Sequence, residues 1–173
     1  KENKYGDELA QYFKKRGIPV YSKRNLNILE IPLAQKLIQV MRYLSAEYDI
    51  PYGGDEMLFE ILHFDWFEIP PIEIAKISVE VAEVQFSEKK TSIRRLLHEK
   101  AMQPPKDLFS TGLHANLKKA SATLERLIAA VPNLTLQVLF EKIVRESGAL
   151  SKIMQSEDKH WQLQVMTGLF DFI

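Results

Sequence analysis

Apolar residues recur every three or four positions along most of the chain, as on one face of an amphipathic helix. One long run of this kind comprises Leu33, Leu37, Val40, Met41, Leu44 and Tyr48. Later runs comprise Ile74, Ile77, Val81 and Val84; Leu113, Leu117, Ala120, Leu124, Leu127 and Val131; Leu136, Leu139, Phe140 and Ile143; and Trp161, Val165 and Leu169. Together with shorter helices expected from Asp55 to His63 and from Ser92 to about Lys100, and with loops of modest length, the pattern predicts a mostly α fold, a compact bundle of about seven or eight helices.

Residues that favour helix ends punctuate these runs. Pro32 suits the first turn of the long helix, because proline lacks the N–H that a first turn leaves unpaired. Asp55 and Ser92 are expected to cap the starts of two further helices with their side-chain oxygens. Gly17 and Gly148 are expected to end helices in the left-handed conformation.

One short segment, Ile18-Pro19-Val20-Tyr21, is predicted to be a strand. Its proline cannot donate to a sheet ladder, so an edge or terminal strand fits best. The rest of the chain offers this strand no partner. We therefore expect it to belong to a sheet formed by residues outside the chain.

The densest cluster of aromatic residues lies between positions 59 and 67 and comprises Phe59, Phe64, Trp66 and Phe67. Exposed aromatic rings can stack on unpaired bases. Here Leu58, Ile61 and Leu62 interleave with the rings, which favours a packed core or a seam between two helices.

Composition and charge narrow the function classes. With 173 residues, 46% of them hydrophobic and 27% charged, the chain suits one large domain or two small ones. The 23 basic and 23 acidic residues cancel, so any contact with nucleic acid must be local. The absence of cysteine excludes disulfides, thiolate metal sites and cysteine nucleophiles. No apolar stretch reaches the roughly 20 residues of a membrane span, so we expect a soluble, cytoplasmic protein that contacts no membrane.

No motif for catalysis or metal binding is recognisable. Gly53-Gly54-Asp55-Glu56 lacks the Lys-Ser/Thr pair of a phosphate-binding loop and is interpreted as a turn that leads into a helix. Glu60, His63 and Asp65 match no ligand spacing. The sequence therefore predicts neither a catalytic residue nor a metal ligand.

The best candidates for DNA contact are the basic residues Lys89, Lys90, Arg94 and Arg95. Several cations along one helical turn can follow phosphates, and a helix N-terminus adds N–H donors. Glu88 and Glu99 dilute this cluster, so an ordinary solvated helix face is the alternative.

Several segments, taken in order, resemble the second RecA-like domain of superfamily 1 DNA helicases of the UvrD, Rep and RecB type. They are Arg16-Gly17-Ile18-Pro19-Val20, the helix around Leu37 to Leu44, the segment from Asp55 to Ile61, and the stretch from Leu136 through Gly148-Ala149-Leu150. The resemblance implies that residues 1–30 are a remnant of the second motor domain. Residues 31–173 would be the helical accessory insertion, the mobile 2B subdomain.

This resemblance also implies a role. The parent protein would be an ATP-dependent DNA helicase acting in DNA repair or recombination, with ATP and magnesium between its two motor domains. The insertion would engage duplex DNA or control unwinding, without ATPase activity of its own. The chain opens without methionine and stops on a helical pattern, so it looks like a piece cut from a longer protein.

Two positions depart from the family pattern. Lys1 stands where the family has an arginine that reaches the ATP phosphates, and a lysine cannot repeat the two-pronged contact of arginine. Where relatives have a Gly-Ile-Gly turn that donates N–H groups to duplex phosphates, this chain has Glu68-Ile69-Pro70-Pro71. These residues favour a regulatory or partner-contacting insertion over a tight duplex clamp. A helical protein-interaction module unrelated to helicases is the rival interpretation.

Overall fold

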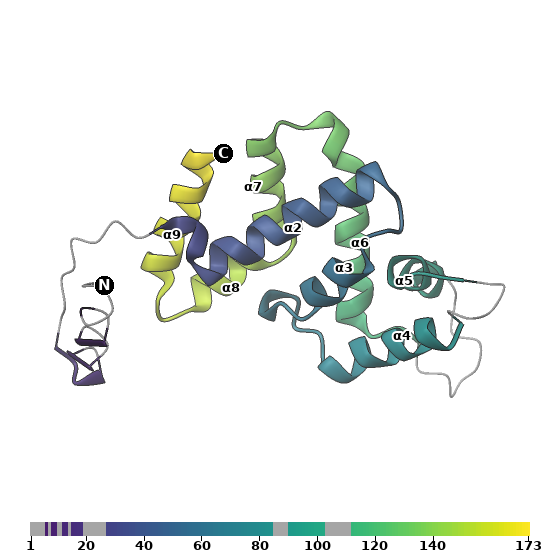
Figure 1. Ribbon diagram of the computed structural model, residues 1–173, viewed down its shortest axis with the longest axis horizontal. Helices are drawn as coiled ribbons and strands as arrows, with labels where there is room; N and C mark the ends of the chain where they lie inside the picture. The colour runs from purple at the N-terminus through teal and green to yellow at the C-terminus, as the bar shows by residue number, and fades with distance from the viewer. Residues whose placement is uncertain are drawn as a thin grey trace.

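The computed structural model describes residues 6, 8–9, 12–13, 15–18, 27–84, 90–102 and 112–173. Residues 27–84, 90–102 and 112–173 form a compact helical bundle, which confirms the predicted mostly α fold (Figure 1). The α-helices are α2 (Pro32–Asp49), α3 (Asp55–Leu62), α4 (Pro71–Val84), α5 (Ile93–Met102), α6 (Ala115–Ala130), α7 (Leu136–Glu146), α8 (Ala149–Gln155) and α9 (Lys159–Phe172). Short 3₁₀ helices lie at η1 (Ile28–Glu30), η2 (Asp65–Phe67) and η3 (Val131–Asn133).

Helix α2 is the central element of the bundle. Figure 1 shows it running diagonally across the molecule, and it packs against α3, α6, α7 and α9. Its contact face includes Leu37, Val40, Tyr43 and Leu44, all without exposed surface. Removing one such leucine side chain from water contributes about 1.5–3 kcal/mol, so this face supplies much of the driving force for folding.

The helix ends agree with most of the sequence predictions. Pro32 is the first residue of α2, and the Ser92 hydroxyl accepts a hydrogen bond from the Arg95 N–H at the start of α5. Gly17 is left-handed, with φ of 69°, and the Ile18 N–H donates to the Phe13 carbonyl across this helix end. Gly148 is also left-handed, with φ of 94°.

The prediction that Asp55 caps its own helix is wrong. The N-cap of α3 is Gly54, and Asp55 is the first helical residue. Both Asp55 carboxylate oxygens instead accept from the Ile93 N–H, at 3.0 and 2.9 Å. Asp55 therefore stabilises the beginning of α5, a different helix that approaches it in the folded chain.

The aromatic cluster is mainly core. Phe64, Trp66 and Phe67 are buried, as the interleaved apolar residues predicted, whereas Phe59 is 39% exposed. Phe59 differs because it lies on the outer side of α3, where its ring packs on His63 with centroids 4.7 Å apart. Residues 19–21 of the predicted strand lie outside the described residues, and Ile18 has no regular secondary structure.

The segment that leads into the bundle lies beside the last helix. Helix η1 packs against both α2 and α9. A Cβ atom on Gly168, in the second half of α9, would lie only 2.5 Å from Cδ1 of Ile28. This close contact joins the entry of the bundle to its final helix, and the end of the Ile28 side chain would have to shift to admit a Cβ atom at position 168. None of the described helices combines the length and the apolar character that a membrane crossing requires.

Candidate functional site

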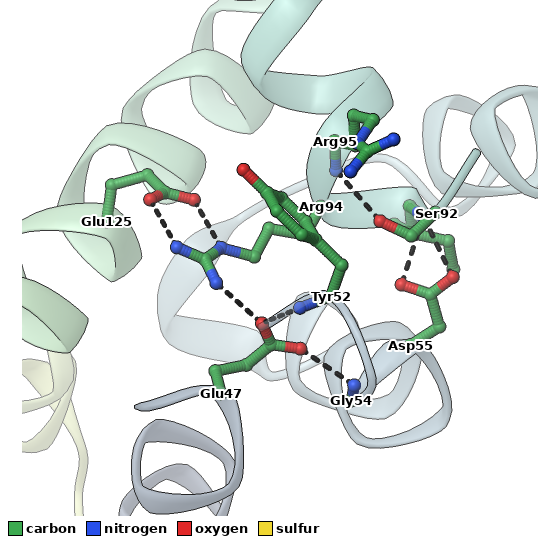
Figure 2. A network of polar contacts seen from close by, with 9 residues as sticks. Glu47, Tyr52, Gly54, Asp55, Ser92, Arg94, Arg95 and Glu125 are labelled. Carbon is green, nitrogen blue, oxygen red and sulfur yellow. Dashed lines mark hydrogen bonds and ion pairs between the residues drawn. The ribbon is translucent and has the colours of Figure 1, made fainter. Parts of the chain in front are cut away.

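A buried carboxylate organises the end of α2. The Glu47 side chain has no exposed surface. Its Oε1 accepts from the Gly54 N–H at 2.7 Å, and its Oε2 accepts from the Tyr52 N–H at 2.8 Å (Figure 2). The chain after α2 thus folds around this carboxylate, which replaces the water that these N–H groups would otherwise bind.

Close packing at this turn requires glycine at position 54. A Cβ atom there would lie 2.8 Å from Oε1 of Glu47 and 3.0 Å from Cδ2 of Tyr43. Neither neighbour can easily move, because both side chains are fully buried. The sequence pair Gly53-Gly54 therefore serves the burial of Glu47 and the start of α3.

Arg94 joins this turn to α6. Its Nη1 donates to Oε2 of Glu47 at 2.6 Å, while Nε and Nη2 donate to the two carboxylate oxygens of Glu125, each at 2.7 Å. The hydrogen bonds to Glu125 and then to Glu47 raise the pKa of Arg94, although burial opposes them. We call Glu47, Gly54, Arg94 and Glu125 the polar junction; it connects α2, α3, α5 and α6 (Figure 2).

Two further titratable groups lie beside the junction, of which Tyr43 is fully buried and Asp55 is half-buried. Burial raises the pKa of the Asp55 carboxyl, and the nearby Glu47 charge adds to this, while the N–H groups of Ile93 and Arg94 act in the opposite direction. Burial also raises the pKa of the Tyr43 phenol, as does Glu47. The Tyr43 hydroxyl has no hydrogen-bond partner within the described part of the chain. A phenol held neutral in this way cannot serve as a base at ordinary pH.

The outer side of the junction carries an aromatic ring between two guanidinium groups. The Tyr52 ring centroid lies 4.9 Å from Cζ of Arg94 and 4.6 Å from Cζ of Arg95 (Figure 2). Tyr52 is 40% exposed and has a φ of 67°, a conformation that is costly for an aromatic residue. The bond from its N–H to Glu47 holds this conformation.

The structure divides the predicted DNA-contact cluster. Arg94 points into the junction, where its side chain is 12% exposed and its donors meet two carboxylates. Arg95 is exposed beside Tyr52, and Lys90 is exposed just before α5. Lys89 lies outside the described residues, as does Lys1, the position compared with the phosphate-sensing arginine.

The turn at Glu68 makes contacts within the chain. Glu68 is left-handed, with φ of 51°, and its carbonyl accepts from Nδ2 of Asn116 at 2.7 Å. Its carboxylate lies 3.4 Å from Nζ of Lys152. The turn at Glu68 is therefore tied to α6 and α8.

Sequence reasoning missed Glu47, Glu125 and Tyr52. Glu47 had a signal, because it falls on the same buried stripe as Val40 and Leu44, at helical spacing. A charged residue on an apolar stripe requires a partner. The positions of that partner, 47 residues further along the chain, and of the second carboxylate had no comparable signal.

Among the described residues, no group of three histidine, aspartate or glutamate side chains is arranged to hold a metal ion. A comparison of the chain with models of protein families, with curated protein sequences and with solved structures finds no match in any of the three. Its function is therefore inferred from its residues and their arrangement.

Proposed function

We propose that this chain is a helical accessory subdomain of an ATP-dependent DNA helicase of the UvrD-like group, which engages duplex DNA or controls unwinding. ATP and magnesium would bind to the motor domains of the parent protein. The observation that carries this proposal is the contact between η1, where the chain enters the bundle, and α9. A segment inserted into another domain needs an entry and an exit that lie together, so that the host domain keeps its own fold.

The polar junction supports a role in which the helical bundle moves as one rigid body. Helix α2 has 18 residues and is about 27 Å long, reaching from the η1–α9 contact to the junction. Its first turn packs near α9, and its last turn is tied through Glu47 and Arg94 to α5 and α6. A displacement at the entry would therefore carry the junction with it.

Within this proposal, DNA contact belongs to the outer side of the junction. Arg94 donates its hydrogen bonds to Glu47 and Glu125, and its guanidinium group positions the Tyr52 ring. Of the predicted cluster, Arg95 and Lys90 are the exposed cations within the described residues, and they can contact phosphates. The chain has no net positive charge, so this contact would be weak and sensitive to salt.

A bridging deletion in the parent helicase tests the insertion. Residues 32–172 would be replaced by a short Gly/Ser linker, which can span the gap if entry and exit are adjacent. We expect the shortened protein to retain ATPase activity stimulated by single-stranded DNA and to unwind duplex at a changed rate. We also expect this 173-residue chain alone to hydrolyse no ATP. Turnover by the chain, or loss of ATPase activity on deletion of the bundle, would contradict the proposal.

A second experiment tests the DNA contact. Lys90→Ala/Arg95→Ala in the parent helicase should weaken binding to a forked duplex and reduce the slope of log affinity against log salt concentration by about 2. The matched control is Lys118→Ala/Lys119→Ala, which removes two exposed cations from α6. Equal effects of the two double variants would contradict a localised contact.

A further inference from the structure

An open groove lies on the side of α3 that faces α4. Its volume is about 580 Å³, and it also reaches residues just before α5. The apolar part of its lining includes Phe59, Val81 and Ile93. Phe59 is 39% exposed, whereas Leu58, Ile61 and Leu62 of the same helix are buried. We call this feature the acidic groove because of the side chains described next.

The charged groups along the groove are carboxylates. Asp55, Glu56 and Glu60 of α3 line it, and no lysine or arginine is among the lining residues that the structure describes. Asp55 accepts from Ile93, and Glu60 accepts from Nε2 of Gln39. Glu56 is exposed and has no hydrogen-bond or ion-pair partner in the part of the chain that is described. An apolar surface beside unneutralised carboxylates attracts cationic ligands and repels phosphate.

The groove also holds a polar atom that lacks a partner. The hydroxyl of Thr91 is buried from solvent, and no described group lies within hydrogen-bonding distance of it. Thr91 is part of the groove lining. A buried hydroxyl without a partner is unfavourable, so the packing at this side of the groove leaves one polar atom unsatisfied.

The apolar surface continues from the groove along α4. Ala82 lines the groove, and Val79 and Ile72 on the same stripe are 57% and 62% exposed. Their spacing, with Ala75 between them, places all four residues on one helix face. The stripe from residue 72 to residue 82 is about 15 Å long, close to three helical turns. This length suits an elongated occupant better than a small molecule.

We propose that the acidic groove and the α4 stripe bind an amphipathic helix of another protein, whose lysine or arginine residues flank an apolar face. Its apolar side chains would cover Phe59 and Val79, and its cations would meet Glu56 and Glu60. This interaction goes beyond the proposed helicase role and does not depend on it. An amphipathic helix that binds in an apolar groove uses anchoring side chains three, four and seven residues apart. The residues of the α4 stripe have a matching spacing.

The test measures binding of a model peptide to the 173-residue chain. The probe is a fluorescently labelled helical peptide with leucines along one face and lysines on either side. A second peptide carries glutamates in place of the lysines. We expect saturable one-to-one binding of the lysine peptide by fluorescence anisotropy, and no binding of the glutamate peptide. Equal binding of both peptides, or of neither, would overturn the proposal.

Variants locate the site. Glu56→Lys/Glu60→Lys and, separately, Phe59→Ser should each weaken binding of the lysine peptide by about tenfold or more. Glu141→Lys/Glu157→Lys changes the net charge equally at two exposed positions away from the groove and should leave binding unchanged. An equal loss in this control would mean that only overall charge matters, which would overturn the proposal. Circular dichroism of each variant confirms that the chain remains folded.

Two competing occupants give different results in the same system. Displacement of the lysine peptide from the chain by a short DNA duplex, with no effect on the free peptide, would assign the groove to nucleic acid. Self-association of the chain that Glu56→Lys/Glu60→Lys abolishes would assign it to a second copy. Either result would overturn the proposal, whereas a monomeric chain whose bound peptide resists duplex supports it.

Discussion

The polar junction and the acidic groove lie on neighbouring parts of α3 and α5, but they differ in whether their carboxylates have hydrogen-bond and ion-pair partners. In the junction, both oxygens of Glu47 and both oxygens of Glu125 have donors. In the groove, Glu56 is exposed and has no described partner. Burial explains the difference, because a buried charge without a partner costs far more free energy than a hydrated one.

This contrast separates structural charges from charges that are free to bind. Arg94 satisfies two carboxylates and fixes the arrangement of four helices, so its charge is already neutralised inside the fold. The neighbouring residue Arg95 is exposed, and its guanidinium group lies over the Tyr52 ring. Adjacent arginines in one helix therefore have different roles, which their burial and partners distinguish.

The largest expected effect is on the junction. Arg94→Ala leaves the buried Glu47 carboxylate without its cation and should lower the free energy of unfolding by about 3–5 kcal/mol, measured by urea denaturation. Arg95→Ala is the matched control and should change it by about 0.5 kcal/mol or less. Adding Glu47→Gln to Arg94→Ala should recover part of the loss, because the amide needs no cation. Similar losses for the two arginine variants would contradict a structural role specific to Arg94.

A smaller effect is expected at Gly54. Gly54→Ala places a Cβ against the buried Glu47 carboxylate and Tyr43 ring, which should lower the free energy of unfolding by about 1–3 kcal/mol. The control is Gly112→Ala, where an added Cβ meets no described atom within 4 Å. Thermal and urea unfolding of both variants measure the difference. If Gly54→Ala is as stable as Gly112→Ala, the tight packing around Glu47 is not required.

The smallest expected effect is a change in pH dependence at Asp55, which borders both regions. Its pKa is raised from the usual 3.8, mainly by burial, so the folded chain binds this proton more tightly than the unfolded chain. That stabilisation is fully present below pH 3.8 and is lost as the pH rises through the folded-state pKa. The stability of the native chain relative to Asp55→Asn should therefore fall across this window, as measured by urea denaturation at successive pH values.

Asp65 provides a comparison of opposite sign. Partial burial acts to raise its pKa, but the hydrogen bond and charge of Lys36 outweigh burial and hold the pKa below 3.8. Its contribution is present above pH 3.8 and is lost as the pH falls through the folded-state pKa. The stability of the native chain relative to Asp65→Asn should thus rise with pH where the corresponding difference for Asp55→Asn falls. Slopes of the same sign would contradict the assignment of burial to one group and ion pairing to the other.

Local sequence features were sufficient to predict most helices. The positions of Pro32, Ser92 and Gly148 mark helix ends because their chemistry acts within a few residues. Asp55 was assigned to the wrong helix because a side-chain cap can serve any N-terminus that lies within reach. Its partner Ile93 is 38 residues away in sequence, and only the folded arrangement brings the two together.

The site was less predictable than the fold. In the sequence, the cluster from Lys89 to Arg95 has the pattern of one basic patch. No local sequence rule indicates that the Arg94 side chain is mostly buried and Arg95 exposed. What separates them is a turn of about 100° around α5, which directs one side chain to Glu47 and the other to the surface. The α4 stripe had no sequence signal, because Val79 and Ile72 resemble core residues until the neighbours of α4 are known.

The central position of α2 has a consequence for how the bundle unfolds. Helices α3, α6, α7 and α9 all pack directly on α2, and these helices come from both the earlier and the later parts of the chain. If α2 separates, each of them loses a partner at the same time. The described bundle should therefore melt in a single cooperative transition, and the slowest-exchanging amides should be those of α2.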